Sequence, residues 1–167
     1  MPEVSDLLLT IAEVSIAMIA FAAIVLVLRQ LVGGGLSTFH VLILQLYAVI
    51  GFSVLFLSFL PLVLHYVGVP TSVLWRLSSA LLAITFVAAN LWYFRRRRVV
   101  APDRGRNAAT IIGSFVVALV IPLLLLHAAG VIFEDTIGPY PIGLLAGLIP
   151  IATTFFASLE DFVEGES

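Results

Sequence analysis

The sequence predicts an all-α membrane protein, a five-transmembrane-helix bundle that forms one integral membrane domain over residues 1–167. Two observations lead to this fold class. The chain is 62 % hydrophobic and 11 % charged, whereas a soluble domain carries about 25 % charged residues. Apolar runs of about 18 residues or more recur between short polar connections, and such runs are long enough to cross the hydrocarbon layer as helices.

Polar residues, glycines and prolines set the limits of the expected spans. Asp6 or Ser5 can cap the first span by accepting a free backbone N–H, and residues 33–35, all glycine, end it. Trp75 and Trp92 lie near the two ends of the third span, where amphipathic rings favour the headgroup depth. The expected spans are residues 7–28, 41–64, 73–94, 108–126 and 141–159.

The arginines predict the orientation of the bundle. Seven of the eight lie in the first and third connections: Arg29, Arg95, Arg96, Arg97, Arg98, Arg104 and Arg106. The positive-inside rule then places the N-terminus outside and the C-terminus in the cytoplasm of an inner-membrane protein. The arginine block in the third connection is expected to anchor this topology and to contact anionic lipid headgroups. A specific phosphate- or partner-binding site is the alternative.

An internal similarity relates the second and third spans to the fourth and fifth. Residues 61–69 resemble residues 122–131, and Gly51 corresponds to Gly113 at a spacing of about 62 residues. The two hairpins would then be parallel repeats, with the first span added. Parallel repeats are one way in which transporters are built.

Four ionisable residues from four spans are predicted to gather in the outer layer of the membrane. With the N-terminus outside, Glu13 lies about 10 Å below the outer boundary at 1.5 Å per residue. His65 and His127 end the second and fourth spans, and Arg76 begins the third. This polar cluster is the candidate ion- or proton-binding site.

Glu13 is the most informative of the four, because a carboxylate in hydrocarbon is costly unless it is paired, hydrated or protonated. Ala17 and Ala20 share its helical face, and small residues allow another helix to approach closely. Glu13 is therefore expected to face the protein interior or an aqueous cleft. It would bind a proton or cation there, or it would be a structural tie to Arg76, a histidine or another helix.

The two histidines leave three interpretations open. His65 and His127 could ligate a haem from both faces, as in cytochrome b-type proteins. They could titrate near neutral pH as a relay or sensor with Glu13. They could also be plain interfacial residues. Although Glu13, His65 and His127 could supply three ligands, nothing in their spacing demands a metal, and no metal site is predicted.

The composition and motifs argue against an enzyme. The chain has no Cys, which excludes disulfides, Fe–S clusters and thiolate zinc sites. It also has no Lys, so it cannot form a retinal or pyridoxal Schiff base. No HExxH, Walker A, GxSxG or GxGxxG pattern occurs in the sequence. Neither an enzymatic activity nor a nucleic-acid partner is expected.

One motif predicts close packing of helices. Gly143 and Gly147 form a GxxxG pattern in the fifth span, which lets a second helix approach the backbone. The contact could form within the chain or between copies, so the motif alone does not establish a dimer.

Residues 11–17, together with Phe21-Ala22 and Leu28-Arg29, resemble the first span of many short bacterial and archaeal membrane proteins without assigned function. The resemblance covers roughly 25 residues. It implies a small polytopic inner-membrane protein and carries no activity with it.

These observations favour a small channel- or transporter-like protein in which Glu13 takes up protons or cations. Because five helices make a thin wall for a pathway, a homo-oligomer is expected. The first alternative is an accessory subunit of a larger membrane complex, whose polar residues only pack. The second is an electron carrier with haem between His65 and His127.

Overall fold

The computed structural model describes residues 2–31, 38–100, 108–133 and 137–164. Every element in these ranges is a helix, so the predicted all-helical fold is confirmed. Four of the helices are long and apolar enough to cross a membrane, and the apolar part of the fifth, Pro139–Thr153, is shorter. The helices are α1 (Pro2–Leu31), α2 (Thr38–Tyr66), α3 (Thr71–Val100), α4 (Ala108–Ala128) and α5 (Pro139–Glu164).

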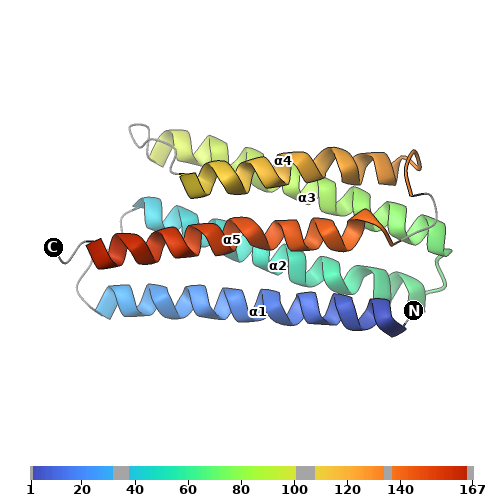
Figure 1. Ribbon diagram of the computed structural model, residues 1–167, viewed down its shortest axis with the longest axis horizontal. Coiled ribbons are helices and arrows are strands. Elements are labelled where there is room, and N and C mark those ends of the chain that lie inside the picture. The colour runs from blue at the N-terminus through green and yellow to red at the C-terminus, as the bar shows by residue number, and fades with distance from the viewer. Residues whose placement is uncertain (1, 32–37, 101–107, 134–136, 165–167) are drawn as a thin grey trace.

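The five helices lie side by side and alternate in direction, so that the two ends of the chain lie at opposite ends of the bundle (Figure 1). We call the end that holds His65 and His127 the histidine end, and the end that holds residues 95–98 the arginine end. Helix α5 packs against all four other helices, whereas α1 packs against α2 and α5. Thus α5 is the central helix, and α1 is an edge of the bundle.

Two glycines allow α5 to occupy this central position. A Cβ atom added to Gly143 would lie 2.8 Å from Leu82 Cδ2, and one added to Gly147 would lie 2.7 Å from Phe86 Cζ. Both distances are far below a normal carbon–carbon contact of about 3.5–4.0 Å. The GxxxG motif therefore packs against α3 of the same chain, and it is not a free surface for dimerisation.

The exterior of the bundle is apolar along the helices. Large hydrophobic side chains such as Phe56, Ile84, Phe115 and Leu119 are each at least 60 % exposed. Soluble monomers rarely expose contiguous apolar surface of this kind. This exterior fits a chain whose surrounding solvent is lipid.

Helices α2 and α4 end in the same way. The N–H of Gly68 donates to the His65 carbonyl and that of Gly130 to the His127 carbonyl, both at 3.0 Å. In each helix the next residue also donates to the carbonyl five positions earlier, which completes a Schellman cap. Both glycines have positive φ, 86° and 71°. The shared cap follows the sequence similarity of these segments, and the duplication itself stays a prediction.

Pro61 creates the contact that fixes the start of α5. Proline has no N–H, so the Leu57 carbonyl in α2 loses its usual helical donor four residues on. The Tyr140 hydroxyl of α5 donates to this carbonyl instead. Tyr140 is fully buried, and its ring lies 6.0 Å from that of Trp75 in α3. One side chain thus ties α5 to α2 and α3 near the histidine end.

We predict that Tyr140→Phe lowers the free energy of unfolding by about 1–3 kcal/mol, because it leaves a buried carbonyl without a donor. Pro61→Ala supplies a backbone N–H to the same carbonyl, so the cost of Tyr140→Phe should fall when both changes are present. Thermal or denaturant unfolding of the four proteins in one detergent measures this coupling. Tyr66→Phe, at a site that is 93 % exposed, is the control. If Tyr140→Phe lowers stability equally with and without Pro61→Ala, the hydrogen bond from Tyr140 to the Leu57 carbonyl would be contradicted.

Candidate functional site

His127 is a fully buried polar side chain at the histidine end. It is 0 % exposed, and its Nδ1 atom lies 2.9 Å from the hydroxyl of Ser79, which is also 0 % exposed. The contact joins the last turn of α4 to the third turn of α3. Buried polar groups are stable in such surroundings only when they have a hydrogen-bond partner. The pair therefore fixes the imidazole in one position between the two helices.

Arg76, on the same helix as Ser79, reaches the turn that follows His127 because Gly130 leaves room for it. A Cβ atom added to Gly130 would lie 2.7 Å from Arg76 Cζ, so the guanidinium rests against the turn that follows α4. Arg76 precedes Ser79 by three residues and shares its helical face. We call Arg76, Ser79 and His127 the histidine-end cluster. Two of the four residues predicted to gather, Arg76 and His127, are members of it.

Glu13 and His65 are not part of the histidine-end cluster. Both are exposed, as are Ala17 and Ala20. The buried face of α1 carries Leu8, Ile11, Ala12, Ser15 and Ala22. At 100° per residue, Glu13 lies on nearly the opposite side of the helix from this face. This corrects the expectation that Glu13 turns toward the interior of its own bundle, where α2 and α5 already pack.

The two histidines have different surroundings. His65 is exposed in the last turn of α2, whereas His127 is buried against Ser79. A haem between them stays a prediction. Among the residues that the structure describes, no three His, Asp or Glu side chains form a group that could hold a metal ion.

The four arginines of residues 95–98 lie in different environments. Arg95 and Arg98 are exposed, whereas Arg97 is only 7 % exposed. Arg97 departs from the headgroup contact expected of the whole block because it follows Ala89 and Tyr93 on the buried stripe of α3. Arg104 and Arg106 lie outside the described residues.

Arg96 is exposed and turns toward α2. Its Nη1 atom donates to the Gln45 side-chain oxygen at 3.4 Å, and its Cζ atom lies 5.9 Å from the centre of the Trp92 ring. The cation–aromatic contact and the hydrogen bond hold this guanidinium over the α2–α3 side of the bundle. Arg96 is thereby distinguished from its exposed neighbours Arg95 and Arg98.

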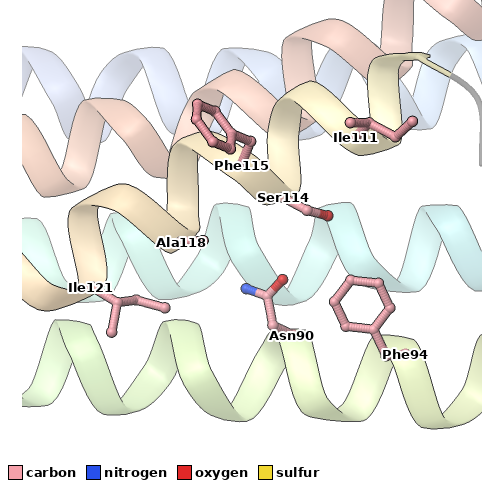
Figure 2. A pocket seen from close by; sticks show the side chains of 7 residues that line it. All are labelled: Asn90, Phe94, Ile111, Ser114, Phe115, Ala118 and Ile121. Carbon is pink, nitrogen blue, oxygen red and sulfur yellow. The ribbon is translucent and has the colours of Figure 1, made fainter.

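A groove of about 410 Å³ lies between α3 and α4. Asn90 and Ser114 bring polar groups to it from the two facing helices, as Figure 2 shows. The Asn90 side-chain nitrogen donates to the Phe86 carbonyl at 2.9 Å. The lining is otherwise apolar, and it consists of Phe94, Ile111, Phe115, Ala118 and Ile121.

The Ser79–His127 contact and the groove between α3 and α4 were not predicted from the sequence. Ser79 is one of several serines in an apolar span, and its pairing with His127 depends on how α3 and α4 are aligned. The groove depends on the same alignment. A usable signal was present for the Tyr140 contact, because Pro61 always frees the carbonyl four residues earlier.

No protein-family model, curated protein or solved structure matches this chain.

We predict that Ser79→Ala costs about 1–3 kcal/mol of stability, because it removes a buried hydrogen-bond partner of His127. Ser78→Ala is the matched control. Ser78 is adjacent and equally buried, but its hydroxyl has no hydrogen-bond partner among the described residues, so its removal should be neutral or stabilising. Unfolding in detergent compares the two variants. A loss of stability that is equal in both would contradict the proposed role of the Ser79–His127 contact.

Proposed function

We propose that the protein is one subunit of an oligomeric membrane protein that conducts protons or cations, with Glu13 as the binding group at the contact between subunits. The observation that carries the proposal is the exposed carboxylate in the apolar stretch of α1, the helix at the edge of the bundle. In hydrocarbon such a carboxylate costs several kcal/mol unless it is hydrated, paired or protonated. A water-containing contact between copies removes that cost.

The small residues beside Glu13 support a close helical contact. Ala17 and Ala20 are exposed on the same side of α1, and small side chains allow the backbones of two helices to approach. Copies that pack through this face would place several Glu13 carboxylates around one axis. Rings of acidic side chains are a common way to select cations.

The interior of a single bundle offers little support for a pathway. Leu74, Leu82, Phe86, Leu124 and Leu144 are each no more than 2 % exposed and fill the space between the helices. An ion path needs groups that replace its hydration shell, and these side chains supply none. A pathway between copies therefore fits the packing better than one through the chain.

The same face of α1 suits a second function, that of an accessory subunit. A larger membrane complex could cover Glu13 with a polar group of another chain, and no ion would then move through this protein. Isolation of the chain only in a fixed ratio with other proteins would favour this function over the first. In either case we place the protein in the inner membrane, with its arginine end in the cytoplasm.

Flux into liposomes that contain the purified protein tests the first function. We predict that Glu13→Gln reduces proton- or cation-dependent flux by about tenfold or more, because the neutral amide cannot exchange a proton or attract a cation. Glu3→Gln changes an exposed acid ten residues earlier in the same helix and should leave the flux unchanged. Equal flux in the Glu13→Gln variant and the unmodified protein would contradict the role of Glu13.

A further inference from the structure

We propose that the groove between α3 and α4 binds one acyl chain of an anionic phospholipid, whose phosphate pairs with Arg98. This inference is independent of the proposed conduction, because it concerns the opposite side of the bundle from α1. Headgroup contact is expected at the arginine end in general, and the proposal specifies the groove and Arg98 as the site and an anionic phospholipid as its ligand.

The register of α3 connects the groove to Arg98. Asn90 and Phe94 line the groove, and Arg98 follows them at the same four-residue interval. Residues at this interval lie on one face of a helix. Arg98 is exposed, so its charge lies beyond the end of the groove on the groove side of α3. Arg97 follows Asn90 by seven residues and shares this face as well, but it is only 7 % exposed, so Arg98 is the exposed arginine of residues 95–98 that lies nearest the groove face by register.

The size and composition of the groove fit a hydrocarbon chain. Along α4 its lining extends from Ile111 to Ile121, which corresponds to about 15 Å at 1.5 Å per residue. Its volume of about 410 Å³ lies within the range of small-molecule sites. The lining combines aromatic and aliphatic side chains, and the groove is open on one side toward the surroundings of the bundle.

The two polar residues fit the part of a lipid that joins its phosphate to its chains. Asn90 and Ser114 face each other across the groove (Figure 2). Polar groups at a lipid-facing surface are costly without hydrogen-bond partners. One amide hydrogen of Asn90 is directed to the Phe86 carbonyl, so a second remains to donate, as does the Ser114 hydroxyl. The ester carbonyls of a phospholipid are acceptors between the phosphate and the tails.

Charge complementarity selects a phospholipid over another apolar occupant. A helix of a partner protein could fill the groove, but its apolar surface would give Arg98 no anion. A phospholipid supplies an anion and an acyl chain in one molecule, in the order that Arg98 and the groove require. Basic residues next to a membrane span also favour lipids with net negative charge.

The test is native mass spectrometry of the full-length protein with phosphatidylglycerol and with phosphatidylcholine of the same acyl chains. We expect phosphatidylglycerol to bind more tightly. Arg98→Gln should weaken its binding by about tenfold, as expected for the loss of one charge-assisted contact. Arg96→Gln is the matched control, because Arg96 is engaged with Gln45 and Trp92, and it should change binding by less than about threefold.

A second pair of variants tests the groove itself. Ala118→Phe fills it and should abolish most binding of both lipids, whereas Ala88→Phe adds the same ring at an exposed site on α3 outside the groove and should not. Glycerophosphoglycerol, the headgroup without chains, should fail to compete. Equal binding of the two lipids with no effect of Arg98→Gln would overturn the site. Binding that survives Ala118→Phe, or full competition by the free headgroup, would also overturn it.

Discussion

Hydrocarbon offers no hydrogen bonds, so a membrane-spanning chain must pair its polar groups internally, and this constraint organises the bundle. Its clearest effect is at Pro61, which frees the Leu57 carbonyl in the middle of an apolar helix. Tyr140 meets that carbonyl from α5 and thereby fixes where the central helix begins. The pairing of His127 with Ser79 follows the same rule between α3 and α4. Two of the contacts between helices are thus set by polar groups, while Gly143 and Gly147 let the apolar surfaces close around them.

Two regions on the outer surface of the described residues carry polar side chains with charge or hydrogen-bonding capacity left over. Glu13 is exposed on the edge helix, and Asn90 and Ser114 bring polar atoms to an open groove. We interpret both as places where something outside the chain completes the surface. Their chemistry differs, because a lone carboxylate between small residues suits another helix and water, whereas a groove that leads to Arg98 suits a lipid. The two proposals can therefore succeed or fail separately.

The helical elements could be predicted from the sequence because hydropathy and helix-ending residues are local signals. The alignment of helices could not, because it depends on how side chains of distant segments fit together. Glu13 shows the limit most clearly: its depth follows from counting residues, but its direction depends on which face of α1 packs against α2 and α5. Arg97 shows the same limit, since it belongs to a basic block and also to the buried stripe of α3.

We infer that the histidine end and the arginine end lie on opposite sides of one membrane. The chain has no Cys, so single cysteines can be introduced without a background. Val67, Val99 and Val131 are 73 %, 82 % and 67 % exposed and lie at successive ends of α2, α3 and α4. We predict that a membrane-impermeant thiol reagent labels Val67→Cys and Val131→Cys in intact cells, and Val99→Cys only after permeabilisation. Labelling of all three from one side, or of Val131→Cys together with Val99→Cys, would contradict the placement of the two ends on opposite sides of the membrane.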